Sequence, residues 1–201
     1  MSVDGTDYRV AVSYQKSYWS YKFKKSGLRY EIAICIKTGK MVWWNGPYLP
    51  GDFNDNMIFQ DALVSELEPG ERAETDRGYR HSAPAYTRVP DGTEDPARSE
   101  MTARVRLRHE TCNNRLKKWN ILAVSYRHDV QRHQNYFGAV AALVQLSFVD
   151  EPLFPVEYND YVIHNNFVLK GFLLSKCKST FNLLVIVRFL SILFLRQLKL
   201  P

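Results

Sequence analysis

Alternating and continuously apolar positions in the first 50 residues predict a β-sheet. A short β-branched stretch at Arg9–Val12 predicts a first strand. Leu28–Lys37 alternates and then becomes continuously apolar, which is typical of a central strand. Thr38-Gly39-Lys40 indicates a tight turn, so Met41–Trp44 should complete a β-hairpin. Gly46-Pro47 and Pro50-Gly51 are expected to interrupt the sheet after this hairpin.

Apolar residues recur at helical spacing in three later segments. The first predicted helix starts with Asn54 or Asp55 as its N-cap and stops before Pro69. The second and longest is expected at Arg98–Leu122, and the third at Gln131–Phe148. Five residues of the longest helix form one apolar stripe that should face the core: Met101, Val105, Cys112, Leu116 and Trp119.

The region between the first two helices has a different pattern. Arg72–Thr75 could form another short strand, and Asp76-Arg77-Gly78-Tyr79 is typical of a turn. Residues 80–97 contain three prolines and a glycine, and we interpret them as a surface loop. Aromatic residues make up 13% of the chain, which suits the packed core of a mixed α/β or all-β protein.

Composition excludes several classes of protein. With 45% hydrophobic and 24% charged residues, the chain is neither disordered nor fibrous. Its three cysteines lie far apart in sequence, which argues against a disulfide scaffold and against a zinc site. The first ten residues lack the basic and apolar regions of a signal peptide, so secretion is not expected.

The net charge of +6 is confined to the end of the chain. Residues 161–201 contain six basic residues and no acidic residue, so residues 1–160 are formally neutral. The segment Phe181–Leu195 is strongly apolar but short, and Arg188 interrupts it. We expect a buried or interfacial helix here and no membrane span. An extension of the chain that was never selected to pack remains open.

Several carboxylates stand at the ends of predicted elements, where two divalent metal ions would need them. Simpler interpretations exist for each residue. Asp55 suits a helix N-cap, Asp76 suits a turn, and Glu110 suits a solvated helix. The candidates for metal-dependent chemistry are Asp4, Asp7, Asp55, Asp76 and Glu110.

The longest helix strengthens the metal-site interpretation at Glu110. Arg106, Glu110, Asn113 and Lys117 share one face of this helix. A carboxylate flanked by an arginine and a lysine suits a metal ligand beside phosphate-binding groups. The alternative is a solvated face stabilised by pairs of opposite charge one turn apart.

Four ordered motifs resemble the DDE superfamily endonuclease domain of Harbinger/PIF-type transposases. VDGTD at 3–7 is similar to the hydrophobic-Asp-Gly-Thr element of that family. GPYLPGDFNDNMIF at 46–59 and TDRGY at 75–79 resemble its second and third elements. RLRHETCNNRLK at 106–117 resembles the Arg-x3-Glu-x6-Lys signature of related transposases. In those transposases Tyr often stands three positions before the signature Arg, where this chain has Ala103.

The resemblance implies an RNase H-like α/β fold, with a mixed sheet flanked by helices. It also implies metal-dependent cleavage and strand transfer on DNA by a site that holds two Mg²⁺ or Mn²⁺ ions. The implied catalytic acids and metal ligands are Asp4, Asp55 and Glu110, with Asp76 as a reserve ligand. The implied phosphate- and DNA-binding residues are Arg106, Lys117, Arg104 and Lys118.

The resemblance runs from about Val3 to Tyr158. We expect residues 1–160 to be the endonuclease domain and 161–201 to be an unrelated basic, apolar tail. We expect an N-terminally truncated member of the family, nuclear in a eukaryote and otherwise intracellular. DNA is the implied partner. A separate DNA-binding protein that supplies site recognition and a homo-oligomer stay open, and membrane binding is not expected. Three alternatives also stay open: an inactive fragment, an adopted remnant that binds DNA or protein without cutting, or a protein that associates with a membrane through 181–195.

Overall fold

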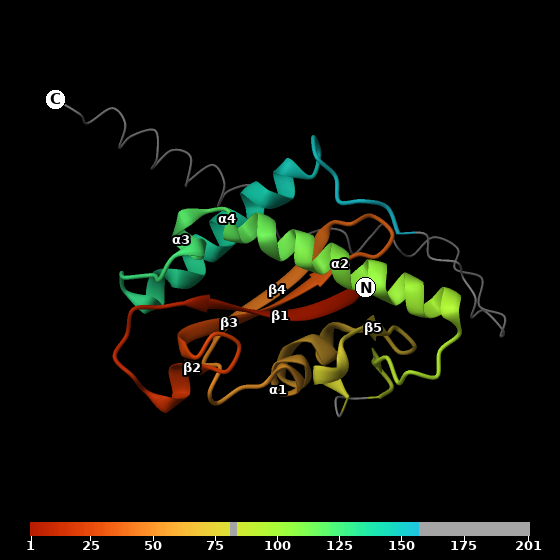
Figure 1. The fold of residues 1–201 in the computed structure, drawn as a ribbon, viewed down its shortest axis with the longest axis horizontal. Coiled ribbons are helices and arrows are strands. Elements are labelled where there is room, and N and C mark those ends of the chain that lie inside the picture. Colours follow the sequence, from red (N-terminus) through yellow and green to blue (C-terminus); the bar gives the residue numbers. More distant parts are fainter. Residues whose placement is uncertain (81–83, 157–201) are drawn as a thin grey trace.

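The computed structural model describes residues 1–80 and 84–156, which form a mixed sheet covered by helices on both faces (Figure 1). The strand order is β2-β3-β1-β5-β6, and β4 also pairs with β3. Antiparallel pairing joins β1 to β3 and β3 to β4, whereas β5 joins β1 and β6 in parallel. The predicted α/β class is therefore confirmed. The strands are β1 (Ser2–Arg9), β2 (Trp19–Ser20), β3 (Lys25–Ile34), β4 (Met41–Tyr48), β5 (Ala73–Glu74) and β6 (Thr87–Arg88).

The first strand starts earlier than the sequence pattern predicted. β1 pairs with β3 from Ser2 to Arg9, and the predicted strand at Arg9–Val12 is wrong. Beyond Arg9 the chain leaves the sheet and keeps one isolated bridge, between Val10 and Tyr126. The polar residues of β1 obscured it, because the sheet is covered on both faces and even Asp7 is buried.

The predicted hairpin of β3 and β4 is confirmed, but β4 continues past Gly46-Pro47 to Tyr48. The expected interruption at Gly46-Pro47 is therefore wrong, whereas β4 does end before Pro50-Gly51. The register shifts between Arg29 and Glu31, and this irregularity accommodates the proline in the strand. Gly46 has a φ of 138°, and a β-carbon there would collide with the ring of Tyr30.

The segment after β4 begins as the predicted helix and then changes geometry. The N-cap is Asn54, whose Oδ1 accepts a hydrogen bond of 2.9 Å from the Met57 amide. The segment divides into α1 (Asp55–Ile58), a π-helical turn (Phe59–Leu63) and a 3-10 turn (Val64–Glu66). β5 confirms the short strand predicted at 72–75. β6 lies in the stretch predicted as a loop, because Thr87 pairs with Ala73.

Helices α2 (Pro96–Lys117) and α4 (His133–Ser147) cover one face of the sheet, and α1 lies on the other (Figure 1). Asp95 caps α2 through a hydrogen bond of 3.0 Å from the Arg98 amide. α2 ends at Lys117, before the predicted Leu122, and a separate short helix follows, α3 (Asn120–Ala123). Trp119 caps α3 and is 43% exposed, so its predicted place in the apolar stripe is wrong.

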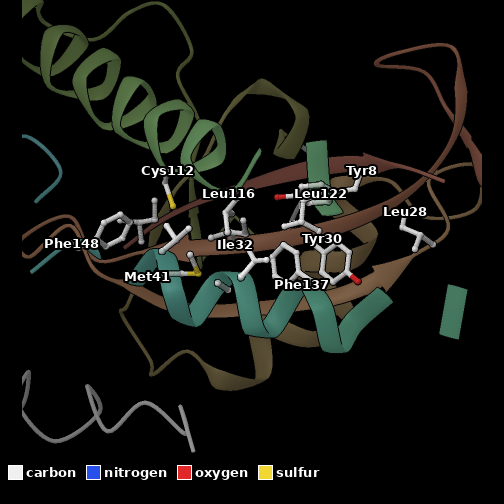
Figure 2. Packing of buried hydrophobic residues seen from close by; sticks show 14 of the residues in the cluster. Tyr8, Leu28, Tyr30, Ile32, Met41, Cys112, Leu116, Leu122, Phe137 and Phe148 are labelled. Atoms are coloured by element: carbon white, nitrogen blue, oxygen red, sulfur yellow. The ribbon is translucent and has the colours of Figure 1, made fainter. Parts of the chain in front are cut away.

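Alternation along β3 divides the core between the two faces. Leu28, Tyr30, Ile32 and Ile34 pack with α2 and α4, whereas Ala33 packs with the residues around α1. Figure 2 shows Phe137 of α4 beside Tyr30, and their rings stack with centroids 4.0 Å apart. Arg29 and Glu31 lie between these apolar positions and share the face of Ala33, because side chains alternate along a strand. The layer between the sheet and α1 therefore contains the charged side chains of Arg29 and Glu31.

No helix in the described part of the chain is both long and apolar enough to span a membrane. The predicted boundary at residue 160, the tail 161–201 and the apolar segment 181–195 lie outside the described residues.

Candidate active site

Asp4 lies on β1, just past the residue at which this strand pairs with β5. β1 pairs with β5 through Ser2 and Glu74, and Asp4 lies two residues beyond that pair. The Asp4 side chain is half-buried, and its Oδ2 accepts a hydrogen bond of 3.4 Å from Asn113 Nδ2 on α2. The helix face that the sequence analysis singled out therefore meets the first strand.

A cavity of about 220 Å³ lies between β1, β5 and α2. Four of the predicted site residues line it: Asp4, Asp76, Arg106 and Glu110. Glu74, His109 and Lys22 also line the cavity, and the sequence analysis did not assign them a role. The cavity thus combines acidic and basic side chains from four separate parts of the chain.

Asp55, the remaining predicted acid, does not line this cavity and packs against Gly5 and Gly78. Because Asn54 caps α1, the Asp55 carboxylate is not needed as the cap, and it lies against the backbone of two glycines. A β-carbon at Gly5 would overlap Asp55 Oδ1, and one at Gly78 would lie 3.5 Å from Asp55 Oδ2. The glycines of the two motifs at 3–7 and 75–79 therefore make room for the acid of the motif between them.

Burial leaves this carboxylate poorly compensated. Asp55 Oδ1 is buried and accepts no hydrogen bond from the described residues. Its ion pair with Arg29 Nη1 is 3.3 Å long. Burial raises the pKa of Asp55 above its ordinary value, Arg29 opposes the rise, and Asp4 adds to it. Asp4 and Asp55 therefore interact electrostatically, although they come from opposite sides of the sheet.

Hydrogen bonds from β2 and β3 give the Asp7 carboxylate a structural role. Arg29 Nε donates to Asp7 Oδ1 at 2.7 Å, and Ser20 Oγ donates to Asp7 Oδ2 at 2.5 Å. Burial alone would raise the pKa of Asp7, but these two hydrogen bonds outweigh it and hold the pKa below the ordinary value. Arg29 of β3 thus forms ion pairs with both Asp7 of β1 and the Asp55 carboxylate.

Glu31 is a buried acid that the sequence analysis missed. It is fully buried on β3, where it pairs with Gly5, and its Oε1 accepts a hydrogen bond of 3.0 Å from the Tyr79 hydroxyl. Oε2 has no hydrogen-bond partner among the described residues. Burial raises the pKa of Glu31 to about 8, and the nearby Asp55 adds to the rise. The available signal was an acidic residue just before the continuously apolar part of the strand.

The predicted basic residues separate into two groups. Arg106 lines the cavity, and Lys117 Nζ lies 5.4 Å from the centroid of the Tyr8 ring, next to the first strand. Burial lowers the pKa of Lys117, and Lys22 lowers it further. Arg104 instead donates to the Pro155 carbonyl at 3.1 Å, and Lys118 is exposed just after α2.

The turn at 76–79 places the reserve acid. Asp76 Oδ1 accepts a hydrogen bond of 2.8 Å from the Gly78 amide, as a turn-forming aspartate does, and the residue also lines the cavity. Tyr79 anchors this turn by packing edge-on against Phe59, with ring centroids 5.8 Å apart.

The fit of these residues to a metal ion is partial. Within residues 1–80 and 84–156, no group of three or more His, Cys, Asp or Glu side chains is assembled closely enough to hold one. The buried Asp55 oxygen without a hydrogen bond is nevertheless the type of atom that a hard cation binds. Asp4, with which it interacts, and Glu110 across the cavity offer further carboxylate oxygens.

Comparison with protein families gives a match to the DDE superfamily endonuclease over residues 3–145. Searches of the curated proteins and of the solved structures found no match. The matched range contains the sheet, α2 and all five candidate acids, and the mixed sheet with flanking helices is consistent with the RNase H-like fold of DDE endonucleases. The chain therefore belongs to the DDE superfamily endonucleases.

Proposed function

We propose that this chain is a metal-dependent DNA endonuclease and strand transferase of the Harbinger/PIF type, with Asp4, Asp55 and Glu110 as its catalytic acids. The family implies DNA as the substrate, and its members generally use divalent metal ions. The observation that carries the proposal is the half-buried Asp55 side chain, whose buried Oδ1 lies 3.3 Å from Arg29 Nη1 and accepts no hydrogen bond from the described residues.

Burying such a charge costs free energy unless a partner of opposite sign compensates it. Arg29 compensates it incompletely, because its shorter and bidentate contacts go to Asp7. A protein therefore gains little stability from Asp55 as it stands. We attribute the presence of Asp55 at this position to the binding of a cation.

In this proposal Asp4 of β1, Asp55 of α1 and Glu110 of α2 would hold the metal ions. Asp76 is the reserve ligand. A pair of Mg²⁺ or Mn²⁺ ions supplies Lewis-acid activation of the attacking oxygen and charge neutralisation at the leaving oxygen. Arg29 keeps the Asp55 carboxylate oriented.

The basic residues bind the substrate. Arg106, at the cavity wall, contacts the phosphate next to the acids, and Lys117 neutralises charge on the neighbouring backbone. Arg104 of α2 and Lys118, just after α2, bind the DNA outside the cavity. Site recognition is assigned to a separate DNA-binding protein.

The second candidate is an adopted remnant that binds DNA or protein without cutting. The observation in its favour is that the described residues assemble no complete set of metal ligands. A remnant of this kind keeps the basic surface but does not respond to metal ions. Titration with metal therefore distinguishes it from the endonuclease.

The test uses the full chain with a labelled duplex and with supercoiled plasmid, in Mg²⁺, Mn²⁺ and EDTA. We expect cleavage in either metal and none in EDTA, and loss of cleavage in Asp55→Asn and Glu110→Gln. Asp52→Asn is the matched control, because Asp52 is an exposed acid three residues before Asp55. Millimolar metal should also raise the Tm of the wild-type chain, and Asp55→Asn should reduce this shift. Wild-type cleavage by Asp55→Asn, or an unchanged Tm in metal, overturns the proposal.

A further inference from the structure

The segment Tyr14–Lys25, here called the aromatic arm, leads from β1 into β3 and combines aromatic rings with lysines. It contains five aromatic residues, four lysines and no acidic residue. Such interleaving is typical of surfaces that bind single-stranded nucleic acid, where rings stack on bases and cations contact phosphates. The aromatic residues are Tyr14, Tyr18, Trp19, Tyr21 and Phe23, and the lysines are Lys16, Lys22, Lys24 and Lys25.

Two rings of the aromatic arm face solvent. Tyr14 is 72% exposed and Tyr21 is 65% exposed, the largest exposures among the aromatic residues of the described chain. Tyr14 is held by an edge-on contact with Trp19, with ring centroids 5.6 Å apart. Lys24 Nζ lies 5.5 Å from the centroid of the Tyr21 ring, so a cation accompanies the second exposed ring.

The arm is fastened to the candidate active site. Lys22 Nζ donates to the Gly5 carbonyl at 2.5 Å, and Lys22 lines the cavity together with Asp4 and Glu110. The Ser20 hydroxyl donates to Asp7 on the same strand. Lys22 therefore places the second half of the arm at the cavity wall.

We propose that the aromatic arm binds an unpaired DNA strand that leads into the cavity. Tyr14 and Tyr21 stack on its bases, and Lys16, Lys24 and Lys25 contact its phosphates. The inference rests on the proposed function, because the acids beside Lys22 are its reason to expect DNA. An unpaired strand is favoured over a duplex because only unpaired bases offer their faces to a side-chain ring.

The test measures binding of a fluorescent oligothymidine and of a hairpin duplex of equal length in EDTA, where no cleavage occurs. Tyr14→Ala/Tyr21→Ala should weaken binding of the single strand by at least about fivefold per ring and leave duplex binding nearly unchanged. Tyr14→Phe/Tyr21→Phe keeps both ring faces and should retain wild-type affinity. Lys24→Gln/Lys25→Gln should reduce the slope of log K against log[salt] by about 1.4.

The matched control is Lys37→Gln/Lys40→Gln, which removes the same charge from exposed lysines at the opposite end of β3. We expect this control to bind like the wild-type chain. Wild-type affinity of the double alanine variant, or an equal loss for single strand and duplex, overturns the inference. This binding assay needs neither metal nor cleavage. If the chain proves inactive but the arm variants still bind the single strand more weakly, the proposed enzyme is contradicted and the inference about the arm is supported.

Discussion

The carboxylate of Asp55 occupies the space where any side chain at position 5 would have to begin. A β-carbon built on Gly5 overlaps Asp55 Oδ1, so the strand and the acid fit together only because position 5 is glycine. The position of Asp55 therefore depends on the missing β-carbon of a residue 50 positions earlier in the sequence.

Gly5→Ala should therefore abolish function at little cost in stability. The overlapping atom is the end of a flexible side chain, so Asp55 moves and the strand stays in place. We expect loss of metal-dependent cleavage and of the metal-induced Tm shift, with a change of less than about 1 kcal/mol in the free energy of unfolding. Urea unfolding and the cleavage assay measure the two effects. Gly46→Ala is the contrasting variant, because its φ of 138° and the Arg29 carbonyl should make it strongly destabilising.

Arg29→Met should destabilise the fold by about 3–5 kcal/mol, because it leaves the buried Asp7 charge without its partner. The double variant Arg29→Met/Asp7→Asn removes the orphaned charge and should recover part of this loss. Chemical denaturation of the wild-type chain, both single variants and the double variant gives the coupling energy. Additive losses in the double variant would show that Asp7 does not depend on Arg29.

Glu31 should make the fold less stable as the pH rises. Its pKa is raised from 4.5 to about 8 in the folded chain, so the folded state binds a proton that the unfolded state releases between these values. Stability from this group is complete below about pH 4.5 and is lost toward pH 8, by on the order of 1.4 kcal/mol for each pH unit. Glu31→Gln should flatten this dependence when unfolding is measured in EDTA. Identical slopes for variant and wild type would contradict the shift.

His133 should act in the opposite direction. It lies in the aromatic core with its Nδ1 2.8 Å from the Tyr30 hydroxyl, and burial lowers its pKa from 6.5 to about 4. Above pH 6.5 both states are neutral at this residue. As the pH falls from 6.5 toward 4, the unfolded chain gains a proton first and stability declines. NMR titration of the His133 ring measures the pKa directly, and an ordinary value near 6.5 would refute this expectation.

Local patterns predicted the elements whose periodicity is contained within the element itself. The apolar run of β3 and the helical spacing of α2 and α4 need no knowledge of the rest of the chain. The face of α2 that holds Glu110 and Asn113 was predictable for the same reason, and it meets Asp4. Residue spacing along a helix determines which side chains share a face.

Contacts between distant segments account for the failures. β1 was missed because Asp4, Gly5 and Asp7 look unlike a strand until β3 and Asp55 are placed beside them. Glu31 gave only the signal of an acid among apolar residues, since its partner Tyr79 comes from a turn 48 residues away. Lys22 was missed because the turn that carries it into the cavity is fixed by Gly5 and Ser20, not by its own sequence pattern.

The unequal pairing of β1 determines how the domain assembles. β1 is bonded to β3 along eight residue pairs but to β5 through the pair of Ser2 and Glu74. Closing the long loop to β5 carries the larger entropy cost and returns fewer hydrogen bonds. The hairpin layer of β1, β3 and β4 should therefore fold first, and the β5–β6 edge should dock last and open first. Local unfolding of the β5–β6 edge should therefore open one wall of the cavity and leave the wall that carries Asp4 in place.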